Sequence, residues 1–261
     1  MRNSRMLVCL AAFAGHALAQ APSKGEQAAA LDAIREYALS YTKRLPNYTC
    51  TQTNRQTIAV RDLTLTESKE FDCGSKQNTW FATPAIALAE GAPSQPAAGE
   101  TSARGEFRKL LDIIFDPETG ADLRWDRQAI LSGRGVYAIA FRVPQSRGYN
   151  LVESKRTIAV PFKGFVYADS ETSAVLRIEM KCIDIPADSE YTGADLTLDY
   201  RPVRVAGEEH ILPAHYLAHF HMVRGDVINE AWFTAYSRFS ADTAIHFEST
   251  DAAIHFEDDP Q

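Results

Sequence analysis

The chain has 261 residues, of which 45% are hydrophobic and 23% charged, and its formal net charge at pH 7 is −7. A chain of this length can bury one sizeable hydrophobic core, so we expect a single domain over residues 20–261. The negative charge argues against nucleic acid as a partner, because phosphate binding requires a basic surface.

The first 19 residues have the pattern of a secretory signal peptide. Arg2 and Arg5 precede an apolar stretch from Met6 to Ala14, and Ala17 and Ala19 form the small-residue pattern that signal peptidase accepts. The apolar stretch is shorter than the roughly 18 residues of a membrane span, and no later stretch reaches that length. We therefore expect cleavage after Ala19 and a periplasmic or secreted protein without a transmembrane span.

A helix and a hairpin are predicted next. From Lys24 to Leu45, apolar residues recur at steps of three and four, and Pro46 ends this amphipathic helical pattern. The segments Tyr48–Val60 and Leu63–Cys73 then alternate as two strands around a turn at Arg61–Asp62.

Two cysteines lie opposite each other in this hairpin. Folding the chain about its turn places Cys50 across from Cys73, at a separation that a disulfide tolerates. We expect them to pair, and the alternative is two reduced, buried cysteines. Cys182 is then left over, and its place on the same strand face as Met180 predicts a buried small hydrophobic residue.

Residues 84–102 consist largely of alanine, proline, glycine, serine and glutamate, which predicts a mobile loop. A second, short helix is expected from Gly105 to Phe115, where Asp116 and Pro117 end it because proline lacks a backbone donor. Residues 249–261 are expected to form an acidic C-terminal tail.

Short alternating runs follow Gly120, separated by turn signals such as Ser132–Gly133 and Arg224–Gly225. The expected strands lie near Leu123–Trp125, Val136–Val143, Leu151–Val160, Gly164–Ala168, Val175–Ile183, Leu196–Val205, Ile211–Val223 and Val227–Phe239. Two short helices cannot cover so many strands if the sheet is flat. We therefore predict an α+β fold in which a long, strongly curved antiparallel sheet wraps around both helices.

Strand periodicity assigns an apolar face to this sheet, because alternate residues of a strand point to the same side. In Val175–Ile183, for example, apolar residues alternate with Arg177, Glu179 and Lys181. The candidate ligand-binding residues on this face are Leu176, Ile178, Met180, Leu196, Leu198, Tyr200, Tyr216, Phe220, Met222 and Phe233.

Six of the seven histidines lie between His210 and His255. His219 and His221 share one strand face, and a two-residue turn at Arg224–Gly225 would place Glu230 across from His219. Two imidazoles and a carboxylate can bind zinc or copper, so these three residues are metal-site candidates. The alternative is a polar outer face whose side chains form hydrogen bonds across strands.

Several segments together resemble an uncharacterised family of secreted acidobacterial proteins, over nearly the whole chain after the signal peptide. These segments are residues 45–53, 105–107, 116–117, 125–127, 164–169, 175–178, 198–200 and 211–213. More distantly, the strand, turn and strand that end in Val175–Ile178, with a later Leu212–Pro213, are similar to envelope lipoprotein carriers of the LolA, LppX and RseB kind.

The distant resemblance implies a half-barrel sheet closed by helices around an apolar cavity for acyl chains. In this chain the corresponding face also carries the polar groups of Tyr200 and Asn229. The resemblance therefore favours an exported, non-catalytic cell-envelope protein that binds an acyl chain, a lipid or a lipoprotein.

Two alternatives stay open. One is an envelope protein–protein interaction module that binds through its sheet surface and the loop at 84–102, with no ligand in its core. The other is a metal-binding protein or enzyme that uses the histidines between His210 and His255. No nucleophile, phosphate-loop or cofactor motif occurs in the sequence, so we expect neither catalysis nor a cofactor.

Overall fold

The computed structural model describes residues 22–76, 79–84 and 106–239. The signal peptide expected at 1–19, most of the loop expected at 84–102, and the tail expected at 249–261 lie outside the described residues, as do His246 and His255. Neither described helix combines the length and the hydrophobicity that a membrane-spanning helix needs.

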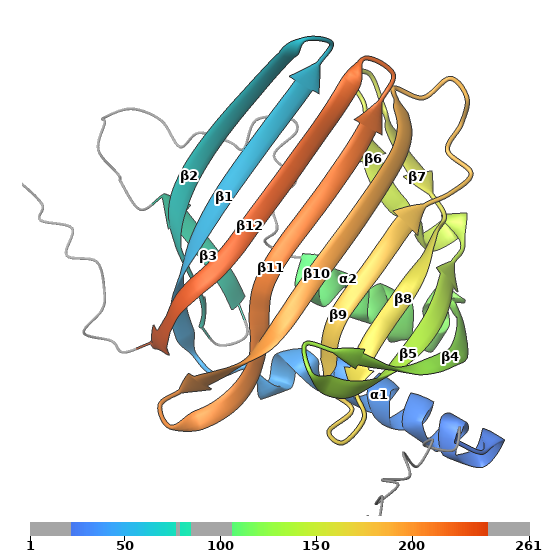
Figure 1. Ribbon diagram of the computed structural model, residues 1–261, viewed down its shortest axis with the longest axis vertical. Coiled ribbons are helices and arrows are strands. Elements are labelled where there is room, and N and C mark those ends of the chain that lie inside the picture. The colour runs from blue at the N-terminus through green and yellow to red at the C-terminus, as the bar shows by residue number, and fades with distance from the viewer. Residues whose placement is uncertain (1–21, 77–78, 85–105, 240–261) are drawn as a thin grey trace, which may run out of the picture.

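Ten strands form one open antiparallel sheet in the order β3-β2-β1-β12-β11-β10-β9-β8-β5-β4 (Figure 1). The strands are β1 (Tyr48–Val60), β2 (Leu63–Lys76), β3 (Thr79–Pro84), β4 (Asp122–Leu131), β5 (Arg134–Val143), β8 (Phe162–Asp169), β9 (Val175–Cys182), β10 (Tyr191–Val205), β11 (Glu208–Met222) and β12 (Gly225–Arg238). A separate two-stranded sheet contains β6 (Tyr149–Val152) and β7 (Thr157–Val160). The predicted α+β class with a long antiparallel sheet is confirmed.

Helix α1 (Lys24–Arg44) begins at a capping box. The Ser23 hydroxyl accepts a hydrogen bond from the Glu26 backbone N–H, and the Glu26 carboxylate accepts one from the Ser23 N–H. These bonds satisfy two backbone donors that the first helical turn would otherwise leave free. The helix ends at Arg44, one residue before the predicted end at Leu45, and Pro46 follows.

Helix α2 (Glu106–Phe115) packs with α1 against the same face of the sheet (Figure 1). The rings of Tyr41 in α1 and Phe107 in α2 both contact the ring of Tyr200 in β10, at centroid distances of 5.6 and 5.1 Å. We call this the inner face of the sheet and the opposite side the outer face. Short 3-10 turns follow at Pro117–Thr119 and Gln145–Arg147.

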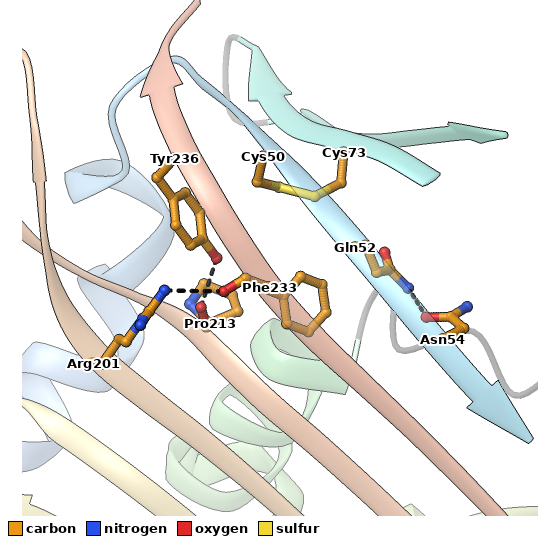
Figure 2. Close-up of a disulfide and its surroundings, with 8 residues drawn as sticks. All are labelled: Cys50, Gln52, Asn54, Cys73, Arg201, Pro213, Phe233 and Tyr236. Carbon is orange, nitrogen blue, oxygen red and sulfur yellow. Dashed lines mark hydrogen bonds between the residues drawn. A yellow bond between two sulfur atoms is a disulfide. The ribbon is translucent and has the colours of Figure 1, made fainter. Parts of the chain in front are cut away.

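The β1–β2 hairpin has the predicted register, with Cys50 paired to Cys73. The two cysteines form a disulfide, so this prediction is confirmed (Figure 2). Cys182 is a free, buried cysteine. Burial raises the pKa of its thiol to about 12, which keeps the sulfur uncharged and unreactive at neutral pH.

The predicted register between β11 and β12 is wrong by two residues. Met222 pairs with Gly225 rather than with Val227, so Val223 and Arg224 form the turn. Gly225 lies in the strand, at a position that has no room for a side chain. An added Cβ there would lie 2.0 Å from the Ala59 carbonyl oxygen. The glycine therefore permits close approach of β12 to β1 instead of making the turn.

The single strand predicted near Leu151–Val160 is also wrong. It divides into β6 and β7, which are joined by the polar residues 153–156, and the Glu153 N–H donates to the Arg156 carbonyl across this turn. Strand β3 was not predicted, because its six residues lie just before the alanine- and proline-rich segment.

Candidate functional site

Apolar side chains from neighbouring strands form a continuous row on the inner face. The register pairs Leu65 of β2 with Ile58 of β1, Ile58 with Val227 of β12, and Val227 with Phe220 of β11. Phe220 in turn pairs with Ala194 of β10. All five side chains occupy equivalent positions in the alternation of their strands, so they share one face.

This row changes from buried to exposed along its length. Phe220 is 6% exposed, whereas Leu65 is 57% exposed. Beside Leu65, the Val60–Leu63 pair at the tip of the hairpin is exposed as well. We call Ile58, Val60, Leu63 and Leu65 the apolar rim. The hairpin tip lies at the opposite end of the molecule from α1 (Figure 1).

Side-chain amides lie between the apolar rim and the core. The Gln52 Nε2 donates to the Asn54 Oδ1 at 2.7 Å, and the Gln56 Nε2 donates to the Asn229 Oδ1 at 2.9 Å (Figure 2 shows the first pair). Gln52 is 1% exposed, and its Oε1 has no hydrogen-bond partner among the described residues. We call Gln52, Asn54, Gln56 and Asn229 the amide belt.

Nine of the ten residues predicted to bind a ligand are buried in the hydrophobic core, and Met222 is half-buried. Contacts with α2 account for part of this burial: the Phe107 ring contacts Phe233 as well as Tyr200, and the Tyr200 hydroxyl donates to the Phe107 carbonyl at 2.6 Å. Phe220 and Met222 differ from the others because they lie at the same level of the sheet as the apolar rim, with β12 between them and the rim.

A carboxyl group that sequence reasoning missed is buried at the start of α2. Burial raises the pKa of Glu106, and the nearby charge of Lys109 opposes this shift in part. One oxygen of this carboxyl is buried without a hydrogen-bond partner among the described residues. Its charge acts on the hydroxyls of Tyr149 and Tyr216, whose pKa values are raised mainly by burial. Nothing in the sequence pattern marks Glu106, because an acidic residue is ordinary in a first helical turn.

The outer face brings His219 and His221 together with Asp226 rather than with Glu230. The Asp226 Oδ1 lies 2.9 Å from the His221 Nδ1 and 3.3 Å from the His219 Nε2. On the other side of His221, its Nε2 lies 3.2 Å from the Asp195 Oδ2. The two imidazole rings are 3.9 Å apart. Register decides the partner, since Asp226 pairs with His221 across β11 and β12.

Glu230 instead pairs with Leu217 in the register and belongs to a neighbouring ion-pair network. Its carboxylate binds Arg55 and lies 3.6 Å from His215. His215 also lies 3.6 Å from Asp199, which accepts a hydrogen bond from Arg177. Arginine cations therefore neutralise both carboxylates that flank His215.

No protein-family model matches the chain, and no curated protein does. Among solved structures, the chain is similar to a LolA superfamily protein from Nitrosomonas europaea, at 12% identity and a TM-score of 0.41, covering 80% of this chain and 94% of that one. A DUF1329 family protein from Desulfovibrio piger matches at 11% identity and a TM-score of 0.41, covering 82% and 93%.

A domain assigned to outer membrane lipoprotein sorting in Vibrio parahaemolyticus matches at 11% identity and a TM-score of 0.42, covering 81% of this chain and 92% of that one. The LolA-like resemblance of the sequence is thus found again among the structural neighbours. With TM-scores below 0.5, these likenesses bear on neither the ligand nor the activity of this chain.

Proposed function

We propose that the chain is an exported, non-catalytic cell-envelope protein that binds the acyl chain of a lipid or lipoprotein on its inner face. The observation that carries this proposal is the apolar row that continues from buried Phe220 to exposed Leu65. Large apolar side chains gathered on an exposed face are typical of interaction sites, whereas single exposed ones are ordinary.

The dimensions of the row suit part of one acyl chain. Its exposed and half-buried part, from Leu65 through Ile58 to Val227, crosses three adjacent strands, which are about 4.8 Å apart, so this part of the row is roughly 10 Å long. An acyl chain spans one leaflet, about 15 Å of the 30 Å hydrocarbon core of a bilayer. Each buried CH₂ group contributes about 0.8 kcal/mol, so the part of an acyl chain that covers Leu65, Ile58 and Val227 would contribute to binding.

The amide belt supports a ligand with a polar linkage next to its apolar chain. Amides of glutamine and asparagine both donate and accept hydrogen bonds, so they can donate to an ester or amide carbonyl and accept from an amide N–H. The Gln52 Oε1 is buried and unpartnered among the described residues, and leaving such an atom unsatisfied costs about 1–3 kcal/mol. A ligand N–H or O–H group would remove this cost, which a plain hydrocarbon cannot do.

Export is supported by two features. The first 19 residues have the pattern of a signal peptide, and Cys50 and Cys73 form a disulfide. Disulfides persist in oxidising compartments such as the periplasm and are rare in the cytosol.

The test is a fluorescence titration of the mature protein with a dansyl-labelled fatty acid, whose emission rises in an apolar site. Leu65→Glu should weaken binding at least tenfold, because a charge in the row cannot be desolvated cheaply. Ile130→Glu is the matched control, since Ile130 is 80% exposed on β4, at the far edge of the sheet. Unchanged affinity in folded Leu65→Glu protein would contradict the proposal.

A second titration distinguishes lipoproteins from lipids as the source of the acyl chain. In it, a lysophospholipid and a diacylated peptide compete with the probe. Stronger competition by the peptide would assign the site to lipoproteins, and stronger competition by the lysophospholipid would assign it to lipids. If neither competes and the probe does not bind, the apolar rim does not serve an acyl ligand.

A further inference from the structure

We propose that His219, His221 and Asp226 form a binding site for a divalent transition-metal ion on the outer face, with Zn²⁺ as the probe. This site is separate from the inner face and does not depend on the proposed function. One ligand atom from each residue can be chosen so that the three atoms lie within 4.8 Å of one another.

The distances between the ligand atoms suit a metal ion. The Asp226 Oδ1 lies 2.9 Å from the His221 Nδ1 and 3.3 Å from the His219 Nε2. Zinc binds imidazole nitrogen and carboxylate oxygen at about 2.0–2.2 Å, so neighbouring ligands of a tetrahedral site lie roughly 3.3 Å apart. Small rotations of the side chains are therefore enough to surround an ion.

The hydrogen bonds around His221 favour this arrangement. Both of its ring nitrogens lie within hydrogen-bond distance of a carboxylate, Asp226 on one side and Asp195 on the other. A neutral imidazole can donate from only one nitrogen, so one carboxylate faces a lone pair. If the Nε2–H donates to Asp195, the Nδ1 lone pair points toward Asp226, and a metal ion between them satisfies both. A carboxylate that orients the ligand histidine in this way is common at zinc sites.

His219 adds an independent observation. Its Nε2 is buried and has no hydrogen-bond partner among the described residues, although it lies 3.3 Å from the Asp226 carboxylate. A buried, unpartnered nitrogen that faces a carboxylate suits a metal ligand; the His215 Nε2 is also buried and unpartnered among the described residues, but the Glu230 carboxylate that it faces already binds Arg55.

The strands hold the site in a fixed geometry. His219 and His221 occupy successive outer positions of β11, Asp195 lies across from His219 on β10, and Asp226 lies across from His221 on β12. Gly193 pairs with His221, and an added Cβ there would lie 3.0 Å from the His221 ring. The absence of a side chain at Gly193 thus leaves room for the imidazole.

Charge distinguishes this site from His215, four residues away on the same face. Arg177 and Arg55 neutralise the carboxylates beside His215. Beside His221, Lys181 lies 3.7 Å from Asp195, but among the described residues no lysine or arginine forms an ion pair with Asp226. The Asp226 carboxylate is therefore available for a metal cation.

The experiment uses mature protein without a polyhistidine tag and measures Zn²⁺ binding by competition with a chromogenic chelator. Wild-type protein should bind one equivalent. The double variant His219→Ala, His221→Ala should lose this equivalent, and Asp226→Asn should weaken binding at least tenfold. Asp195→Asn, which removes a positioning residue, should weaken it about tenfold. His215→Ala is the matched control and should bind within about threefold of wild type.

Circular dichroism of each variant establishes that it is folded, and Asp226→Asn keeps the test informative because it preserves side-chain shape. Retention of the full equivalent by the double variant would overturn the proposal, since the ion would then bind elsewhere, for example at His246 and His255. Equal loss in His215→Ala would also overturn it, because a general histidine effect would explain the binding.

Discussion

The two faces of the same strands, β10 to β12, carry opposite chemistry. At inner positions, Leu198, Tyr216 and Ala231 follow one another across the sheet and are buried in the core. At outer positions one residue away, Asp199 forms an ion pair with Arg177 and lies 3.6 Å from His215, and these groups are in partial contact with solvent. Because alternate residues of a strand point to opposite sides, one backbone can present an apolar binding row and a polar metal-ligand cluster independently.

The pKa values of carboxyl groups on the two sides of the sheet are also shifted in opposite directions. On the inner side, burial raises the pKa of Glu106. On the outer side, burial would likewise raise the pKa of Asp199, but hydrogen bonds from His215 and Arg177 outweigh it and lower the pKa. The environment of a carboxyl, rather than its type, thus decides whether its charge is tolerated.

The largest expected effect is on inner packing. Phe233→Ala removes a ring that is 1% exposed and packs on Phe107, so we expect the free energy of unfolding to fall by about 3–5 kcal/mol. Ile228→Ala, on the outer face of the same strand, should cost clearly less because that side chain is only half-buried. Urea unfolding of both variants measures the difference, and equal losses would contradict the distinction between the faces.

The disulfide comes next. Cys50→Ser with Cys73→Ser opens a link between positions 23 residues apart, and should lower the free energy of unfolding by about 2–4 kcal/mol. Thermal unfolding under oxidising and reducing conditions measures this. Wild-type protein should approach the variant when reduced, whereas a wild-type melting temperature unaffected by reductant would show that the bond adds nothing.

A smaller effect is expected at the outer carboxyl. A lowered pKa means that Asp199 stabilises the fold above its unfolded pKa of about 3.9, and that this stability is lost as the pH falls through the folded value. Asp199→Asn should therefore lower the free energy of unfolding by about 1 kcal/mol at pH 7 and by less below pH 4. Unfolding curves of both proteins between pH 7 and below pH 4 measure this difference. A difference in the free energy of unfolding that does not change with pH would contradict the lowered pKa of Asp199.

The smallest effect has the opposite sign. A raised pKa means that Glu106 favours the fold below its unfolded pKa of about 4.3, and that this contribution is lost as the pH rises through the folded value. Glu106→Gln should thus be more stable than wild type at pH 7, by less than about 1 kcal/mol, with the gain vanishing near pH 4. Asp112→Asn, at a half-buried position on the same helix where the carboxylate pairs with Arg108, is the control. A Glu106→Gln variant less stable than wild type at pH 7 would contradict the raised pKa of Glu106.

Local sequence patterns predicted most of the architecture. Alternation assigned the faces, proline marked the end of α1, and the turn at Arg61–Asp62 placed Cys50 opposite Cys73. The candidate metal site was predicted only in part, because Gly225 was interpreted as a turn residue. Its real role is contact with the backbone of Ala59 on β1, a strand distant in sequence, and no local pattern contains that information.

The inner site was predicted in part for a similar reason. The apolar face was found by periodicity, but exposure depends on which strands the helices cover. Leu63 and Leu65 were left out of the candidate site because the pairing of β1 with β12, which extends the row to them, joins residues more than 160 positions apart.

The central claim is that the apolar row on the inner face binds an acyl chain, and photo-crosslinking tests it most directly. A fatty acid with a diazirine near its methyl end is bound to the mature protein, irradiated and mapped by mass spectrometry. Saturable crosslinks should fall within 58–65 and 220–227, which contain the exposed end of the row. Crosslinks confined to outer-face residues or to the β4–β5 edge would contradict the account.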